Sequence, residues 1–156
     1  GTPPQDATAN AAHAETSGSL SEGTLIADGL RLVGREPIRI PGSPANAWNA
    51  GGAMSLVLWL KPISTANEMT LVHRPGAAGF RLGLAAGGAP FVEVDGQARA
   101  VATGTVADNT WRQLAVTAAD GKVTLYLDGA EAAVLNAPLP GGDGPIFLGG
   151  PDPAVS

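Results

Sequence analysis

The sequence predicts an all-β fold of antiparallel strands, either a sandwich or a barrel, and three observations carry this prediction. Short segments of alternating apolar and polar residues follow one another closely from Thr24 to Gly150. Turn-forming residues mark the breaks between them, and the chain holds 22 glycines and 13 prolines. No segment carries a sustained helical stripe. At 156 residues the chain has the size of one domain.

The strands are expected in a regular succession after a polar entry. Residues 1 to about 22 are small and polar without periodicity, so we expect residues 1–8 to form a linker and residues 9–156 a single domain. In chain order, the expected strands lie in TLIADGLRLVG, EPIRI, AMSLVLWLKP, MTLVHR, GFRLGLA, PFVEV, ARAVA, WRQLAVTA, KVTLYLDG, EAAVL and PIFLGG. The first residues are Gly-Thr-Pro-Pro rather than Met, so we expect an excised part of a longer protein.

The clearest unit is a three-stranded meander over residues 111–135. Asp120-Gly121 and Asp128-Gly129 each supply the pair of positive-φ residues that a two-residue hairpin turn requires. Pairing across the first turn sets Ala115 opposite Tyr126 and Thr117 opposite Thr124. One face, the expected core face, then carries Leu114, Val116, Val123, Leu125 and Leu127. The other, a solvated or binding face, carries Trp111, Gln113, Thr117, Thr124, Tyr126 and Asp128.

Composition excludes several classes of partner. The net charge of −5 gives no electrostatic basis for binding nucleic acid or an anionic membrane. No apolar stretch approaches the roughly 20 residues that span a bilayer, so we expect no membrane insertion by this segment. The absence of cysteine excludes disulfides, zinc–thiolate sites and thiol nucleophiles.

Several stretches, taken in order, resemble the laminin-G-like or concanavalin-A-like domains of bacterial extracytoplasmic proteins. The matching stretches are DATANAAH, LRLVGREPIRIP, MSLVLWLKP, TLVHR, GFRLGL, DNTWRQLAVTAADGKVTLYLDG and GPIFLGG. The resemblance implies a two-sheet antiparallel jelly-roll sandwich. Carbohydrate binding or protein adhesion is the usual role in the family, with catalysis confined to some branches. It also implies an extracytoplasmic setting, periplasmic, cell-surface or secreted, as part of a larger and in some cases membrane-anchored envelope protein.

The end of the chain departs from the family pattern. Family members usually continue past the Gly-Gly into a final strand, whereas this chain stops at PDPAVS. We therefore expect a domain that lacks this strand and leaves unpaired backbone groups at one sheet edge. A version extended by about 20 residues is expected to be more soluble.

Two carboxylates in FVEVDG raise the question of catalysis. Glu93 and Asp95 are two residues apart, and paired carboxylates on one sheet face perform glycoside hydrolysis. The related glucanases use Glu-x-Asp-x-Glu along one strand, but here Gln97 stands at the third position and Gly96 interrupts the strand. We favour a three-residue hairpin loop, which sets Glu93 beside Arg99 on the neighbouring strand. The sequence thus predicts a protein that is not an enzyme.

A glycan ligand requires an aromatic platform beside planar polar groups. Tyr126, with Gln113 and Asp128 on the same face, forms the best candidate cluster, although an ordinary solvated sheet face has the same pattern. Trp48, in the loop SPANAWNAGG, is either a second platform or a plug at the edge of the sandwich. Trp59 and Trp111 match structural positions of the family, so we favour packing in the interior over a sugar platform for both.

No cofactor is firmly predicted, but the resemblance raises one metal. Lectin-like jelly rolls often hold a calcium ion, and Asp6 matches a family position near such ions, with Asn10 as a companion. The alternative role for Asp6 is an Asx-turn at the chain's entry. His13 and His73 have no zinc-site spacing, so we expect His13 on a loop surface and His73 packed in a strand.

The sequence therefore predicts a non-catalytic recognition module, and a glycan is the expected ligand. The competing class is a structural or protein-interaction domain without a sugar ligand, which the aromatic content of only 4% favours.

Overall fold

The computed structural model is an all-β sandwich, as predicted, and describes residues 13–16, 25–26, 29–30, 32, 37–76, 79–96 and 98–150. Its strands are β1 (Glu15–Thr16), β2 (Leu25–Ile26), β3 (Gly29–Leu30), β4 (Ile38–Ile40), β5 (Met54–Leu60), β6 (Met69–Arg74), β7 (Phe80–Leu84), β8 (Pro90–Val94), β9 (Ala98–Val101), β10 (Arg112–Ala119), β11 (Lys122–Leu127), β12 (Ala130–Leu135) and β13 (Ile146–Leu148). In the described residues the one helical element is a short 3₁₀ turn, Pro44–Asn46. None of the described helical structure is long and apolar enough to cross a membrane.

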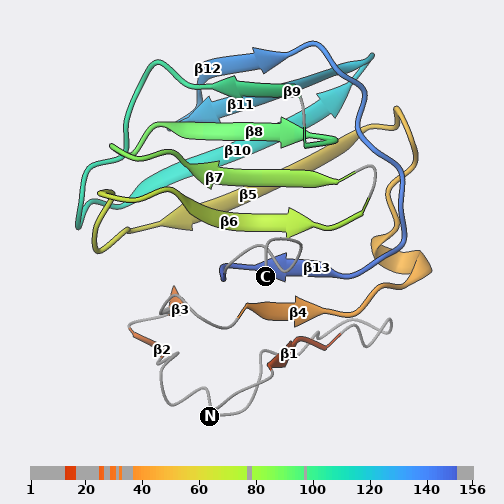
Figure 1. Cartoon of the computed structure of the whole chain (residues 1–156), viewed down its shortest axis with the longest axis horizontal. Helices are drawn as coiled ribbons and strands as arrows, with labels where there is room; N and C mark the ends of the chain where they lie inside the picture. The colour runs from red at the N-terminus through yellow and green to blue at the C-terminus, as the bar shows by residue number, and fades with distance from the viewer. Residues whose placement is uncertain are drawn as a thin grey trace.

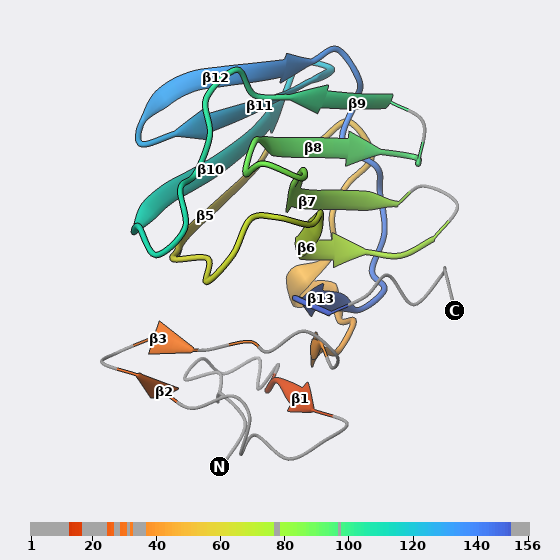
Figure 2. The ribbon, with the colours of Figure 1, turned by 60° about the vertical axis from the view of Figure 1, so that its left-hand side comes forward.

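Two antiparallel sheets form the two layers of the sandwich (Figure 1). The larger sheet has the strand order β1-β4-β13-β6-β7-β8-β9, and the smaller has the order β12-β11-β10-β5. A separate two-stranded pair joins β2 to β3. Figure 2 shows the layers from the side, with β9 and β12 next to each other at one edge of the sandwich.

The core fills the space between the sheets and follows the period-2 pattern of the strands. Alternate residues face inward because successive side chains of a strand point to opposite sides. The buried core residues include Val72, Phe80, Leu82, Leu84, Val92 and Val94 from the larger sheet, and Leu114, Val116, Ala118, Val123, Leu125 and Leu127 from the smaller. Each fully buried side chain of this size contributes about 1.5–3 kcal/mol, so Val and Leu build this core with little aromatic content.

The predicted meander is confirmed in register and in face. Ala115 lies opposite Tyr126 and Thr117 opposite Thr124. Leu114, Val116, Val123, Leu125 and Leu127, the predicted core face, are all buried. Three Asp-Gly pairs form turns with positive φ at both residues: Asp95 (58°) and Gly96 (65°), Asp120 (51°) and Gly121 (74°), Asp128 (50°) and Gly129 (81°). These residue types accept the left-handed region at low cost, which is why the hairpins close there.

Strand β5 lies at the edge of the smaller sheet, and its outer edge has no partner strand among the described residues. It pairs with β10 in continuous register from Met54 to Leu60. Its inward side chains Met54, Leu56 and Leu58 are only half-buried, whereas Leu114 and Val116 of β10 beside them are fully buried. The sandwich is therefore less completely covered along β5 than at its centre.

Arg74, the last residue of β6, joins two loops to the larger sheet through hydrogen bonds. The guanidinium is buried and donates hydrogen bonds of 2.6 Å to the carbonyl oxygens of Asn46 and Gly142. Burial lowers the pKa of Arg74, and the negative charge of Asp143 opposes that shift. The loop that contains Asn46 and the loop that contains Gly142 are thus both held by hydrogen bonds from the guanidinium of Arg74.

Candidate functional site

Three aromatic residues gather on the outer face of the smaller sheet. We call this surface the tryptophan face and define it by Val57, Trp59, Trp111, Gln113, Ala115 and Tyr126. Trp59 of β5 lies directly opposite Gln113 of β10, and the next row places Val57, Ala115 and Tyr126 side by side on three strands. Trp111 precedes β10 by one residue and lies on the same side as Gln113, two positions away.

The tryptophans of this face are exposed, which corrects the sequence interpretation. Trp59 is 63% exposed and Trp111 is 53% exposed, so the expectation that both pack in the interior was wrong. Val57, two positions from Trp59 on the same side of β5, is 58% exposed as well. Large apolar side chains that stand together in solvent mark binding surfaces more often than single exposed ones do.

The sequence held a signal for one of these residues but not for the other. Trp111 lies two residues before Gln113, so the period-2 pattern of the meander already assigned it to the polar face. For Trp59 no comparable pattern exists, because Ser55 is the one polar residue of MSLVLWL and both faces are otherwise apolar. Its position became clear only from the pairing of β5 with β10, which joins strands about 50 residues apart in the chain.

The predicted cluster of Tyr126, Gln113 and Asp128 lies together, but its members have different surroundings. Tyr126 and Gln113 are half-buried on the tryptophan face. Asp128 instead accepts a 2.9 Å hydrogen bond from the backbone N–H of Gln113, and its other carboxylate oxygen lies 2.7 Å from Nε of Arg112. The carboxylate of Asp128 therefore stabilises the end of the β10–β11 pairing, where both of its oxygens already have partners.

Trp48 lies apart from this face, at the opening of the core between the sheets. Its ring meets Phe80 edge-on with centroids 5.2 Å apart, and the guanidinium of Arg74 covers it at 4.2 Å from the ring centroid. Its backbone forms an isolated bridge with Gly142. This half-buried position is that of a plug between loops, and Arg74 occupies the ring face that a sugar would need.

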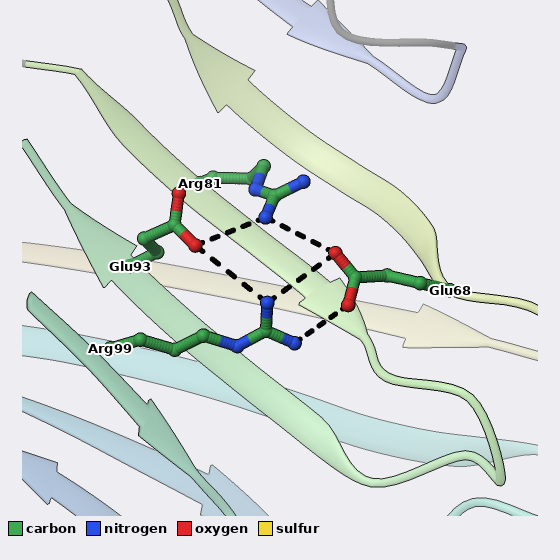
Figure 3. Close-up of polar contacts among 4 residues, drawn as sticks. All are labelled: Glu68, Arg81, Glu93 and Arg99. Atoms are coloured by element: carbon green, nitrogen blue, oxygen red, sulfur yellow. Dashed lines mark hydrogen bonds and ion pairs between the residues drawn. The ribbon is translucent and has the colours of Figure 1, made fainter. Parts of the chain in front are cut away.

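The outer face of the larger sheet carries a cluster of four charges (Figure 3). Arg81 of β7 contacts Glu93 of β8 at 3.0 Å and Glu68, just before β6, at 3.1 Å. Arg99 of β9 donates to both carboxylate oxygens of Glu68, at 2.8 and 3.4 Å, and lies 3.7 Å from Glu93. The hydrogen bonds from Arg99, aided by the charge of Arg81, hold the pKa of Glu68 below its usual value, against an opposing effect of burial.

A buried aromatic ring lies beneath this cluster. Phe91 shares its side of β8 with Glu93, yet it is 0% exposed. The guanidinium carbon of Arg99 lies 3.7 Å from the ring centroid and that of Arg81 lies 4.9 Å away. The ring also occupies the space above Gly83 on β7, where an added Cβ would come within 2.6 Å of it. The cluster therefore covers apolar surface and pairs its own charges.

The predicted hairpin at FVEVDG is confirmed. Val94 pairs with Ala98, which leaves three residues in the loop, and Glu93 pairs with Arg99. Asp95 belongs to the turn with a φ of 58°, so it does not continue the strand on which Glu93 lies. Two strand-borne carboxylates aimed into one cleft, as the glucanase motif requires, are not formed here. Gln97 lies outside the described residues.

A small pocket next to the cluster offers less room than a ligand site normally does. Its volume is about 200 Å³, and its polar lining comes from His73, Arg74, Arg81, Glu93 and Asp95. Pockets for small molecules typically measure about 300–1,000 Å³. His73 is buried in β6 and stacks on Phe147 with centroids 5.0 Å apart, as expected for a histidine packed in a strand.

The metal prediction falls on a part of the chain that the structure does not describe. Asp6 and Asn10 lie outside the described residues, so the calcium site stays a prediction. Among the residues that are described, no three His, Cys, Asp or Glu side chains gather as metal ligands. His13 is exposed, as expected.

Comparison with solved structures finds the same fold in several carbohydrate-related proteins. Domain 4 of the GH43 extracellular arabinanase of Geobacillus stearothermophilus, solved in complex with arabinotriose, has a TM-score of 0.67 and 22% identity. The match covers 94% of this chain and 77% of that chain. Galectin LEC-6 of Caenorhabditis elegans has a TM-score of 0.51 and 17% identity over 74% of this chain and 83% of its own. Identities this low establish a shared fold alone.

The mouse laminin alpha1 chain, domains LG4-5, is a further structural match. It has a TM-score of 0.52 and 17% identity, and the alignment covers 67% of this chain and 30% of the laminin chain. A comparison with curated protein sequences found no match. The sequence profile of the concanavalin A-like lectin/glucanases superfamily matches residues 37–154, most of the two sheets described above. The chain thus belongs to the concanavalin A-like lectin/glucanase superfamily, within its laminin G branch.

Proposed function

We propose that this domain is a non-catalytic carbohydrate-recognition module whose glycan lies on the tryptophan face. The observation that carries the proposal is the exposure of Trp59 and Trp111, at 63% and 53%, beside the amide of Gln113. A pyranose ring has a flat apolar face and a rim of hydroxyl groups, so it stacks on an aromatic ring while planar amides bind its rim. Tyr126 adds a third aromatic ring and a hydroxyl group within the same sheet.

The superfamily and the structural matches support this proposal. One matched structure contains arabinotriose and another is a galectin. Asp128 is left out of the proposed contact set because its carboxylate is held by Arg112 and the backbone of Gln113. Trp48 is left out because Arg74 covers its ring. The proposed site therefore consists of Trp59, Trp111, Gln113 and Tyr126.

Burial of the exposed rings sets the scale of the affinity. A tryptophan side chain buries about 150–250 Å² when fully covered, and apolar area contributes about 25 cal/mol per Å². A sugar that covers half of the exposed part of each ring gains about 1–2 kcal/mol per tryptophan. Two such contacts and a few hydrogen bonds give a dissociation constant near the millimolar range, because association itself has an entropic cost. The module is expected to depend on several copies or on the rest of a larger protein for tight attachment.

Binding to a glycan array, with the protein displayed in multivalent form, tests the proposal. We expect Trp59→Ala and Trp111→Ala to lose binding while their melting temperatures stay close to that of the parent, since exposed side chains contribute little to stability. Val101→Ala is the matched control, because Val101 is 47% exposed on the outer face of the opposite sheet. Glycan binding that survives both aromatic substitutions would place the ligand elsewhere.

The competing function is a protein-interaction domain, and it is favoured by the outer edge of β5, which no strand of the described residues pairs with. An edge strand presents free backbone N–H and C=O groups to which a partner strand can add. The absence of binding to any glycan, together with a protein partner lost in a β5 variant, would support this function instead. An exported or cell-surface location, as part of a longer polypeptide, is proposed under either function, and the family supports it.

A further inference from the structure

Lys61 adds a cation to one end of the tryptophan face. It lies one residue after β5 and two positions after Trp59, so the alternation of the strand places both on the same side. The register of β5 with β10, continued by one position past its last pair, sets Lys61 opposite Trp111. The two segments stay side by side beyond this point, because the backbone N–H of Asn109 donates a 2.7 Å hydrogen bond to the carbonyl oxygen of Pro62. Lys61 is thus a neighbour of both exposed tryptophans.

The ammonium of Lys61 has no ionic partner in the part of the chain that the structure describes. Lys61 is exposed, and none of the described carboxylates forms an ion pair with it. The carboxylates of the neighbouring segments have other partners. Asp128 is bound by Arg112 at 2.7 Å, and Asp108 accepts hydrogen bonds of 2.6 and 2.8 Å from the backbone N–H and the hydroxyl of Thr65. The ammonium is therefore available to a ligand.

A lysine ammonium and a neutral amide favour different groups on a sugar. The amide of Gln113 suits hydroxyl groups, whereas a full positive charge gains most from an anionic acceptor, because charge-assisted hydrogen bonds are about twice as strong as neutral ones. On glycans such an acceptor is a uronate carboxylate or a sulfate. Across the sheet, β12 places the exposed carboxylate of Glu131 opposite Tyr126, where it repels an anionic group. These charges favour one orientation, with the anionic group of the ligand at Lys61.

We infer that the tryptophan face binds an acidic glycan, with the anionic group of one sugar at Lys61 and a sugar ring on Trp59 or Trp111. This inference rests on the proposed function and specifies the ligand class of that same site. The net charge of −5 provides no long-range attraction for such a ligand. The acidic group is therefore recognised through one local contact rather than through a basic surface.

Binding to immobilised polysaccharides, measured by biolayer interferometry, tests the inference. The acidic probes are polygalacturonate, hyaluronan and chondroitin sulfate, and the neutral probes are galactomannan, hydroxyethylcellulose and linear arabinan. We expect at least one acidic polysaccharide to bind. Its carboxyl-reduced or desulfated form should bind about three- to tenfold more weakly, between the effects of an exposed ion pair and a shielded charge-assisted hydrogen bond. Whichever treatment weakens binding identifies the anionic group as carboxylate or sulfate.

Two lysine variants locate the contact. Lys61→Gln should weaken binding to the acidic polymer about three- to tenfold and leave binding to its neutralised form unchanged. Lys122→Gln is the matched control, because it removes the same charge from an exposed lysine at the far end of the β10–β11 hairpin. Lys122 lies roughly 25 Å from Lys61 along the strands, about three times the Debye length at physiological salt, so its loss should not alter binding. Trp59→Ala should weaken binding at least about tenfold.

The outcomes separate the inference from the proposed function. Trp59-dependent binding that is equally strong in Lys61→Gln and in the parent overturns the inference and leaves the proposed function in place. So does Trp59-dependent binding to neutral polysaccharides alone. Equal losses in Lys61→Gln and Lys122→Gln overturn the inference as well, because they indicate an effect of net charge. Binding to none of the six polysaccharides removes the proposed function together with the inference.

Discussion

The stacking of Arg99 on Phe91 is expected to stabilise the outer face of the larger sheet, and its energy can be measured. The ring is fully buried under a guanidinium 3.7 Å from its centroid, and the Arg99 side chain is 29% exposed. A cation over an aromatic face contributes about 0.5–1 kcal/mol at exposed sites and about 2 kcal/mol when desolvated. For this partly shielded pair we expect a coupling of about 1 kcal/mol.

A double-mutant cycle of Phe91→Leu and Arg99→Met measures this coupling. Leu keeps most of the apolar bulk and Met keeps the apolar stem, so neither substitution opens a large cavity. Arg99→Met also removes the ion pair with Glu68, but that loss occurs in both backgrounds and cancels in the cycle. The free energies of unfolding of the four proteins come from urea denaturation followed by fluorescence.

The control cycle pairs Phe91→Leu with Arg39→Met. Arg39 lies on β4 of the same sheet, forms its own ion pair with Glu15, and is separated from β8 by β13, β6 and β7. Its coupling to Phe91 should lie within about 0.3 kcal/mol of zero, as for distant sites. A coupling for Phe91 and Arg99 that is equally small would refute the stacking argument and leave the cluster as a set of surface ion pairs.

Three further predictions concern stability and association. Arg74→Leu should lower the free energy of unfolding in urea by about 1–3 kcal/mol, because the part-buried carbonyl oxygen of Asn46 loses its donor, whereas that of Gly142 still accepts from the backbone N–H of Trp48; a loss below about 0.5 kcal/mol would contradict this. Glu68→Gln should cost about 0.5 kcal/mol at pH 7, where the lowered pKa keeps the carboxylate charged beside Arg99. This difference is present above the unfolded pKa near 4.5 and should vanish as the pH falls through the lower folded pKa; a difference that persists at pH 2 would show another origin. Val57→Lys, on strand β5, whose outer edge has no partner among the described residues, should raise the concentration at which light scattering detects oligomers, and an unchanged threshold would show that neither this edge nor the tryptophan face drives association.

Much of the fold followed from local chemistry, because period-2 segments and Asp-Gly turns act over a few residues. The register of β10 with β11 is an example: the turn at Asp120-Gly121 fixes which side chains face each other without knowledge of the rest of the chain. The loop after Glu93 is a second example, since the place of Gly96 was enough to set Glu93 beside Arg99. In both hairpins the strands that pair are adjacent in sequence.

The candidate site depends on pairing that is not local, and this is where the sequence interpretation failed. The position of Trp59 depends on β5 joining β10, a pairing between distant segments, and a strand with Ser55 as its one polar residue reveals little of which face is buried. The assignment of Trp111 to the interior rested on the family resemblance and overrode the local pattern, which had placed it beside Gln113. Arg81 completes the charged cluster from β7, which is adjacent to β8 in sequence, but the loop between them has no two-residue turn signal that would set Arg81 opposite Glu93.

The contact between Phe91 and Gly83 has a consequence for how relatives of this protein vary. The ring fills part of the volume that a side chain at Gly83 would take, and the backbone carbonyl oxygen of Met69 on β6 lies closer still, 2.4 Å from an added Cβ. A smaller residue at the position of Phe91 would therefore not by itself make room for a larger one at the position of Gly83. Relatives that keep the pairing of β6 with β7 should retain glycine there, whichever residue stands at the position of Phe91.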